Sequence, residues 1–276
     1  MTPSPTTLRI AGDARLMVGA PYALLLQVAH PVVSAGVAEH SNFQEDPYGR
    51  LVRTLDYVNV SVFGDDATAA EMGRRTREMH KRIKGLMPDG THYHSLEPGP
   101  FAWVHATLVH SILKVAATFG RAPGAAERET FYEDWRVLGE HIGVRERDLP
   151  ATHAEFADYV ATMEREALED TESARTVLHT LMKPKAPPIP YVTDGVWGAA
   201  RWPATRVARL TTLGLLGPVP RDRLHLSWSR SRQRQFDALA AAHRAAGPVL
   251  PRSAREFGPT YLRHRRTALA RQGFAV

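Results

Sequence analysis

Apolar residues recur every three or four positions along most of the chain, whereas runs in which apolar and polar residues alternate are nearly absent. A spacing near 3.6 residues gathers apolar side chains on one face of a helix. No Asn-Gly or Asp-Gly pair stands between two alternating runs, so hairpins are not expected. The pattern predicts an all-α fold.

The stretch from Pro21 to His40 is apolar on nearly every side. A helix of this kind is buried, because none of its faces gains from contact with water. We therefore predict a central helix over these residues. Pro31 lacks a backbone N–H, which predicts a kink at this point and a freed carbonyl near Gln27.

A second helix is predicted to begin at Asp46-Pro47, because an aspartate N-cap followed by proline is a common helix start. A third is predicted from Asp65 to Gly85. Its acidic residues lie at the N-terminus, the positive end of the helix dipole, and a glycine lies at its C-terminus. The expected inward stripes are Leu51, Leu55, Val58 and Val62 on the second helix, and Met72, Met79 and Ile83 on the third.

A loop rich in proline and glycine is expected over residues 86–100. Thr152 and Glu155 form a T-x-x-E capping box, which predicts a helix start at Thr152. Further helices are predicted from Phe101 to Phe119, from Ala125 to Ile142, from Pro203 to Leu216 and from Trp228 to Ala246, before a last one that ends in the basic tail.

The clearest change of composition is KPKAPPIP, residues 183–190, where four of eight residues are proline. Such a segment predicts a stiff, extended connector, which we expect to reach residue 203. Residues 1–20 are expected to form an N-terminal arm. Residues 204–276 are poor in apolar side chains, so we predict one domain in which they form a helical subregion packed on the core.

The chain has 276 residues and 13 histidines but no cysteine. Structural disulfides, thiolate-ligated haem, iron–sulfur clusters and cysteine nucleophiles are therefore excluded. The motifs H-E-x-x-H, G-x-S-x-G, the P-loop and G-x-G-x-x-G are all absent from the sequence. Any metal would be held by histidine, carboxylate or tyrosine.

The formal net charge is +6 and the sequence pI is about 9.8. Arginines are scattered among acidic residues, and only Arg263 to Arg266 (RHRR) form a cluster, so we expect no nucleic-acid partner. The N-terminus carries neither a twin arginine nor an unbroken apolar run, which predicts a cytoplasmic protein. The most apolar run, Tyr22 to Ala38, is too short and polar for stable membrane insertion.

Two histidines stand out by position. His80 lies at the edge of the third helix's apolar stripe, beside Met79, where it could reach a flat apolar cofactor between helices. His105 lies on the apolar face of the fourth helix, between Phe101 and Leu108. A core histidine with a satisfied hydrogen bond is the alternative interpretation for both.

The second helix places Arg50, Arg53, Thr54 and Tyr57 at positions i, i+3, i+4 and i+7, so they share one face. That face adjoins the apolar stripe. Two guanidiniums and a hydroxyl beside a core could bind the propionates of a haem or hold dioxygen and substrate in a pocket. A solvated helix face is the alternative.

Several segments occur in an order and spacing that resemble the domain shared by the rubber oxygenases (latex-clearing proteins) and the fungal MpaB oxygenases. They are LQVAHPVVSAGVAEHSNFQEDPYGRLVRT, REMHKRIKG, FAWVHATLVHS, DLPAT, RLTTLGLLGPVPRDRLHLSWS and LPRSAREFGP. The resemblance covers most of the chain and implies a helical, globin-like core with additional helices around it. It also implies one haem b per chain.

Within this resemblance, His80 matches the proximal ligand of the haem iron. From its position between Phe101 and Leu108, we expect His105 to be a second residue of the cofactor site, packed in the core near the haem and bonded to a neighbouring helix. Arg50, Arg53 and Thr54 match the distal side, with Arg53 also a candidate partner for a propionate. Rubber oxygenases carry lysine where this chain has Arg53, and arginine does not readily coordinate iron. We therefore expect an open or water-bound sixth position.

The resemblance further implies a distal glutamate base, for which Glu39 and His40 are the candidates. It leads us to expect a haem-dependent oxygenase that acts with dioxygen on a small apolar substrate, such as a terpenoid or a secondary metabolite, with an electron donor as a further candidate partner. Two alternatives remain open at this point. They are a haem-dependent desaturase or cyclase, and a non-catalytic protein that binds haem or an apolar ligand.

Overall fold

The computed structural model describes residues 2–188 and 192–274, and it confirms the all-α fold. Its α-helices are α1 Pro5–Ala11, α2 Ala20–Val28, α3 Pro31–His40, α4 Pro47–Phe63, α5 Asp66–His80, α6 Pro98–Phe119, α7 Ala125–Ile142, α8 His153–Glu166, α9 Glu172–Met182, α10 Asp194–Leu215, α11 Pro218–Arg223, α12 Arg230–Ala246, α13 Arg252–Arg255 and α14 Gly258–Arg271. Short 3₁₀ helices are η1 Ala14–Gly19, η2 Glu146–Asp148 and η3 Gly247–Val249, and a hairpin pairs β1 Lys84–Leu86 with β2 His92–His94. The globin-like arrangement stays a prediction.

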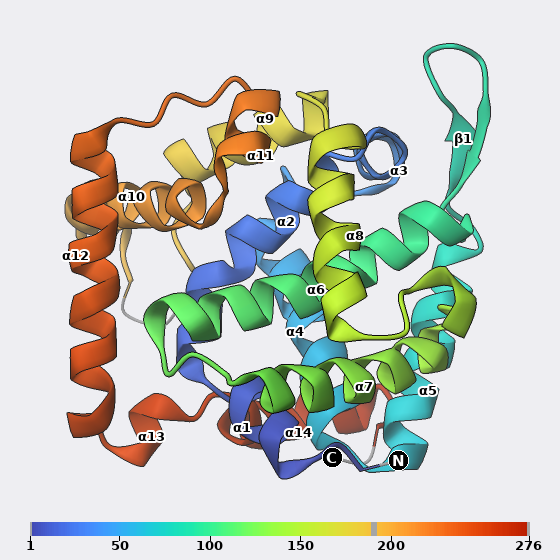
Figure 1. Cartoon of the computed structure of the whole chain (residues 1–276), viewed down its shortest axis with the longest axis horizontal. Coiled ribbons are helices and arrows are strands. Elements are labelled where there is room, and N and C mark those ends of the chain that lie inside the picture. The colour runs from blue at the N-terminus through green and yellow to red at the C-terminus, as the bar shows by residue number, and fades with distance from the viewer. Residues whose placement is uncertain (1, 189–191, 275–276) are drawn as a thin grey trace.

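Helix α6 occupies the centre of the molecule, and most of its side chains between Phe101 and Phe119 are buried. It contacts η1 and the helices α1, α2, α7 and α12, which surround it (Figure 1). The indole N–H of Trp103, a fully buried side chain, donates to the Leu26 carbonyl at 3.2 Å and joins α6 to α2. The buried position expected for residues 21–40 is confirmed for α2, which packs beside α6, whereas α3 is mostly half-buried or exposed.

The single kinked helix predicted over residues 21–40 is wrong: α2 and α3 are separate helices, and the chain bends by 104° between them. His30 has an extended backbone, with φ −80° and ψ 125°, as the residue before a proline prefers. The carbonyls of Val28 and Ala29, freed at the break, accept hydrogen bonds from the Thr171 hydroxyl at 2.6 Å and the Glu169 N–H at 2.8 Å. The break therefore anchors the loop before α9.

None of the described helices is by itself long and apolar enough to cross a membrane. The bent pair Ala14–Val28 and Pro31–His40 would pass that test together, by length and composition only.

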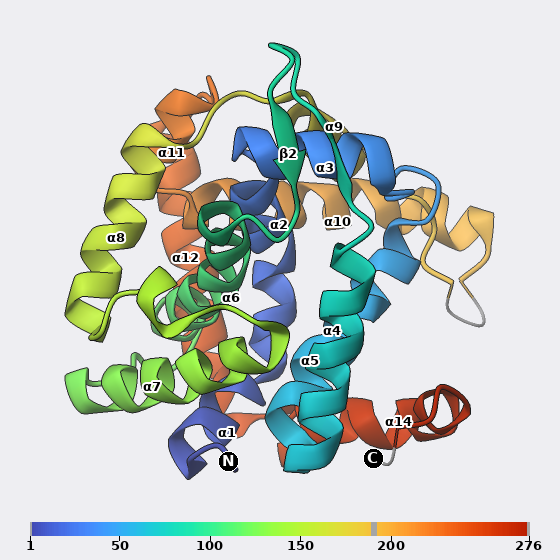
Figure 2. The same ribbon diagram turned by 90° about the vertical axis from the view of Figure 1, so that its right-hand side faces the viewer.

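The helix predicted from Asp65 to Gly85 ends earlier, at His80. The residues that follow form the β1–β2 hairpin, which projects from the body of the molecule (Figure 2). Gly90 turns the chain with a φ of +84°, a conformation that favours glycine. It follows Asp89, and an Asp-Gly pair is a common signal for a hairpin turn. The sequence contained this Asp-Gly signal, but three-residue strands are too short to show alternation. Met79, expected in the inward stripe, is 52% exposed.

Two expected segment boundaries also need correction. Residues 1–20 are not an arm, because α1 contacts α4, α6 and α7 and buries Ile10 and Ala11 in the core. The connector expected over residues 183–203 is shorter, since α10 begins at Asp194 and contains Pro203 within it. Residues 189–191 of the connector lie outside the described part of the chain.

The basic tail contributes to packing through an ion pair. Asp56 of α4, 6% exposed, accepts two hydrogen bonds from the Arg265 guanidinium, at 2.7 and 3.0 Å. The hydroxyl of Tyr261 donates to the same carboxylate at 2.7 Å. A planar guanidinium fits a carboxylate in this two-point manner. One arginine of the RHRR cluster therefore fastens α14 to α4.

We predict that Asp56→Ala lowers the free energy of unfolding by about 3 kcal/mol, because it leaves a partly buried guanidinium without its counter-charge. Urea denaturation measures the change. Arg263→Ala, an exposed position on the same helix, is the control and should stay within about 0.5 kcal/mol of the wild type. A loss of under about 0.5 kcal/mol in Asp56→Ala would contradict a structural role for the pair.

Candidate active site

A cavity of about 350 Å³ lies between η1, α2, α4, α6 and α9, and residues Pro184 and Lys185 also line it. This volume is within the range of small-molecule sites. Its walls are mainly apolar side chains: Leu16, Met17 and Leu24 from η1 and α2, Leu51, Leu55 and Val58 from α4, Leu108 and Ile112 from α6, and Val177 and Leu181 from α9. An apolar ligand would gain free energy from entering it.

Helix α4 forms one wall of the cavity because its start is fixed. Asp46 caps the helix by accepting the Gly49 N–H at 2.8 Å, and Pro47 occupies the first turn. From there, Arg50 and Thr54 follow one turn apart and both line the cavity. The predicted inward stripe of this helix is therefore mostly cavity wall, and of its members Val62 is fully buried.

Arg50 carries the cavity's unbalanced charge. Its Nη1 donates to the Ser41 hydroxyl at 2.6 Å, and within the described ranges it makes no ion pair with a carboxylate. Burial lowers the pKa of Arg50, and the nearby charge of Arg53 lowers it further. Arginine nevertheless stays protonated in proteins. A poorly solvated cation that no carboxylate balances favours an anionic or charge-developing ligand.

His80 is the last residue of α5, and its ring is held from two sides. The Thr76 carbonyl lies 2.7 Å from Nδ1, so Nδ1 carries the proton, since a carbonyl can only accept. The ring meets Phe101 edge-on, with 5.6 Å between centroids. Nε2 then has a lone pair and no hydrogen-bond partner among residues 2–188 and 192–274. This is the state of a histidine that ligates metal.

Electrostatics connects His80 to Arg50. Burial lowers the pKa of His80, the Thr76 carbonyl opposes that shift, and the charge of Arg50 lowers the pKa further. The imidazole is therefore neutral at pH 7. Arg50 lines the cavity and His80 does not. Arg50 is therefore the residue that links the cavity to the surroundings of His80.

Thr54 and Arg53 differ in their surroundings although they are neighbours in sequence. The Thr54 hydroxyl donates to the Arg50 carbonyl at 3.2 Å and lines the cavity. Arg53 is 57% exposed, donates to the Asn42 side chain at 3.3 Å and lies 3.9 Å from the Asp46 carboxylate. Arg53 is not part of the cavity wall. The predicted shared face thus separates into a cavity side and a solvent side.

Tyr57, the fourth member of that face, packs into the hydrophobic core and does not line the cavity. Burial raises its pKa.

His105 is buried between α6 and α7, away from the cavity. Its Nε2–H donates to the Trp135 carbonyl at 2.8 Å, which leaves Nδ1 buried without a partner in the described structure. Burial lowers the pKa of His105 to about 4. Gly139 makes the close packing feasible, because a Cβ there would stand 2.9 Å from the His105 ring. His105 thus bonds to a neighbouring helix, as a core residue does.

The two candidates for a distal base, Glu39 and His40, lie at the end of α3 against the hairpin. The Tyr93 hydroxyl donates to Glu39 at 2.7 Å, and the Glu39 carboxylate contributes to raising the pKa of Tyr93 to about 12, after burial. His40 Nε2 donates to the Lys84 carbonyl at 3.1 Å. Neither residue lines the cavity. Glu39 and His40 therefore contact the β1–β2 hairpin, and they are not part of the cavity that Arg50 lines.

Sequence reasoning missed polar residues of the cavity wall. Ser111 of α6 has a buried hydroxyl with no partner in the described part of the chain, and it lines the cavity. Tyr48 donates to the Lys185 carbonyl at 2.7 Å, and the Lys185 ammonium donates to the Glu45 carbonyl at 2.8 Å. Ser111 is a polar residue on an apolar helix face, a signal that could have been used. The Tyr48–Lys185 contact spans 137 positions and left no local signal.

The sequence of the chain matches one protein family over most of its length. A family model described as the ER-bound oxygenase mpaB/B′ and rubber oxygenase catalytic domain matches residues 8–245. The chain belongs to this family of oxygenases, as the resemblance of its segments predicted.

Two curated relatives are similar to it, an uncharacterised protein of Mycobacterium bovis and another of Mycobacterium tuberculosis. Each is 24% identical over 241 residues, which span 84% of this chain and 88% of the relative. No solved structure matches the chain.

The low pKa of His105 predicts how stability depends on pH. The unfolded residue binds a proton below about pH 6.5, but the folded one does so only near pH 4. The unfolded state then holds more protons between these values, so the free energy of unfolding falls as the pH falls through this window. One such histidine contributes at most about 1.4 kcal/mol per pH unit.

His105→Gln keeps a donor for the Trp135 carbonyl but does not titrate. Urea denaturation of both proteins at several values between pH 4 and 7 should show a shallower slope for the variant. Equal slopes would mean that His105 is not held neutral by burial.

Proposed function

We propose that this chain is a haem-b-dependent oxygenase that uses dioxygen to oxidise a small apolar substrate, with His80 as the axial ligand of the iron. Membership of an oxygenase family supports the class of reaction. The observation that carries the proposal is the position of Arg50. It presents an unpaired guanidinium to an apolar cavity and lies within electrostatic reach of a neutral, ligand-ready histidine.

The residues present fit a haem group in three respects. Haem iron takes a neutral imidazole, and His80 has its proton committed to the Thr76 carbonyl. The ring is oriented by Phe101, which limits its rotation. A propionate or another anion would balance the charge of Arg50. In the described ranges no three His, Asp or Glu side chains gather to hold a metal, and haem requires only one axial ligand from the chain.

Bound haem would supply the redox-active iron for the activation of dioxygen. The task of the protein is then electrostatic. Arg50 would stabilise negative charge that develops on oxygen, because a permanent cation at a poorly solvated position acts strongly on nearby charge. The hydroxyl proton of Thr54 is used by the Arg50 carbonyl, so Thr54 offers an acceptor to a polar group of the substrate.

The apolar walls support the proposed class of substrate. Leu24, Leu55 and Leu108 face the cavity from three different helices and would exclude water around a hydrocarbon. Lys185, tied to Tyr48, lies at the same cavity and places a second cation at its wall. A small molecule with an apolar body and a single polar or anionic group fits this lining.

We predict that His80→Ala abolishes the Soret absorption of the haem-loaded protein, because Nε2 of His80 is the atom that would hold the iron. His92→Ala, which removes an exposed histidine of the hairpin, is the control and should retain one haem per chain. Far-ultraviolet circular dichroism checks that both variants fold. An unchanged Soret band in His80→Ala would reject this residue as the ligand.

We predict that Arg50→Ala and Thr54→Ala retain haem but lower turnover with dioxygen. The loss of a polar contact to developing charge costs about 10²–10³ in rate. Haem content and oxygen consumption are measured on the same samples. Wild-type rates in both variants would mean that Arg50 and Thr54 take no part in the reaction. If the wild type binds haem but shows no turnover, the chain is a binding protein and not an enzyme.

Arg53→Ala separates binding from chemistry. If Arg53 serves a propionate, as its place on the shared face of the second predicted helix led us to expect, its loss should speed haem release more than it slows turnover. A haem-transfer assay to an excess of apomyoglobin measures the release rate. Unchanged release would fit the structure's solvent-side contacts with Asn42 and Asp46 and assign Arg53 a surface role.

A further inference from the structure

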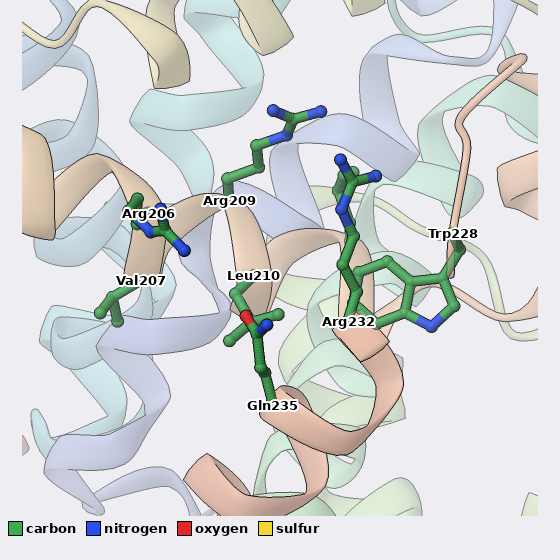
Figure 3. Close-up of a pocket in the computed structure, with 8 residues that line it drawn as sticks. Arg206, Val207, Arg209, Leu210, Trp228, Arg232 and Gln235 are labelled. Carbon is green, nitrogen blue, oxygen red and sulfur yellow. The ribbon is translucent and has the colours of Figure 1, made fainter. Parts of the chain in front are cut away.

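A second cavity, of about 340 Å³, lies between α10 and α12 and differs in character from the first. Figure 3 shows Arg209 of α10 and Arg232 of α12 pointing to the same side, with Trp228 beside Arg232. The lining residues are Arg206, Val207, Arg209, Leu210, Leu213, Trp228, Arg232 and Gln235. We name this the α10–α12 groove. Its lining combines three guanidiniums with apolar side chains.

Trp202 extends this groove along α10. Residues 202, 206 and 209 are spaced by four and three positions, so they lie on one face of the helix. The guanidinium of Arg206 stacks over the Trp202 ring, 4.8 Å from its centroid. The Trp202 side chain is nevertheless 67% exposed. A tryptophan this exposed gains nothing from the interior and is available to a partner.

The positive charge of this face has no internal counterpart. Arg206, Arg209 and Arg232 make no ion pair with a carboxylate within the described residues, and Arg232 donates instead to Ser227. Residues 195–235 contain a single acidic residue, Asp222, against eight arginines at positions 201, 206, 209, 221, 223, 230, 232 and 234. Uncompensated arginines of this density attract anions.

Aliphatic side chains that are exposed on α10 and α11 indicate which class of anionic partner fits, and one of them, Val207, lines the groove itself. Val196 and Val207 of α10 are 54% and 46% exposed, and Val219 of α11 is 40% exposed. Aliphatic side chains do not stack on nucleobases, but they gain free energy at the boundary between lipid headgroups and acyl chains. Tryptophan is likewise enriched at that level of a membrane.

We infer that the α10–α12 groove and the exposed start of α10 bind the surface of an anionic membrane. Arg206, Arg209 and Arg232 contact the phosphates of lipid headgroups, and Trp202 enters the headgroup layer. This is peripheral binding, in which no segment spans the bilayer. It rests on α10 and α12 and does not depend on haem.

The position of this surface gives it a role in substrate delivery. The Trp197 indole N–H, on the first turn of α10, donates to the Pro184 carbonyl at 3.1 Å. Pro184 and Lys185 line the cavity that holds Arg50. Helix α10 also contacts η1 and α2, which form another wall of that cavity. An apolar substrate dissolved in the bilayer would thus meet the protein close to its cavity.

Sedimentation with vesicles tests the inference. The full chain is mixed with vesicles of equal parts phosphatidylcholine and phosphatidylglycerol, and with vesicles of phosphatidylcholine alone. We expect binding to the anionic vesicles that weakens as salt is raised. The double variant Arg206→Gln/Arg209→Gln should bind about 30-fold more weakly, since each basic residue near the surface contributes appreciably to binding.

The matched control is Arg263→Gln/Arg266→Gln, which removes the same charge from exposed positions on α14. It should bind within about two-fold of the wild type, because α14 lies away from α10 (Figure 1). Trp202→Ala should also bind anionic vesicles more weakly. Because the Trp202 side chain is exposed, its removal should not disturb the fold, so this variant serves as the test if the double variant does not fold.

Three results would overturn the inference. The first is absence of wild-type binding to anionic vesicles. The second is an equal loss in the α14 control, which would mean that only net charge matters. The third is binding of glycerol 3-phosphate or a single-stranded oligonucleotide that depends on Arg209 while vesicles do not bind, which would assign the groove to a soluble phosphate ligand.

Discussion

Pro31 has no backbone N–H, and the residue before it cannot readily continue a helix, so the apolar segment that begins at Pro21 breaks into two. The 104° bend has consequences on both sides of the break. The freed carbonyls of Val28 and Ala29 hold the loop before α9, and α9 then closes one wall of the cavity. Beyond the bend, α3 ends at His40, and the hydroxyl of the next residue, Ser41, accepts from Arg50. The cavity and its cation therefore both depend on this turn of the chain.

The cavity combines two properties that rarely occur together without a ligand. Its walls are apolar, yet Arg50 contributes a cation that no described carboxylate neutralises. Burying such a charge costs free energy, and that cost is recovered when an anion or developing negative charge is present. The neutral His80 nearby adds a donor atom of a different kind. Elsewhere in the protein, at Asp56, a buried charge is balanced within the chain. The contrast marks the cavity as a place built for a partner.

Much of the fold could be predicted because helix signals are local. The predicted helix from Ala125 to Ile142 has the same bounds as α7. Its apolar periodicity and the glycines directly before and after it are local signals. The early end of α5 at His80 was missed together with the β1–β2 hairpin, because strands of three residues are too short to show alternation. For the site, the spacing of Arg50 and Thr54 was sufficient to place both on one face, and both line the cavity. The proximity of His80 to Arg50 arises from the packing of α4 on α5, which no local pattern encodes.

The central claim is that this arrangement binds one haem b through a single histidine, and absorption spectroscopy tests it most directly. Haem is titrated into the full-length protein after any bound haem has been removed. The account predicts a Soret band that grows until one equivalent has been added and then stops. The pyridine haemochrome of the loaded sample should identify b-type haem, with one group per chain. A titration that shows only the spectrum of free haem, or that never saturates, would contradict the account.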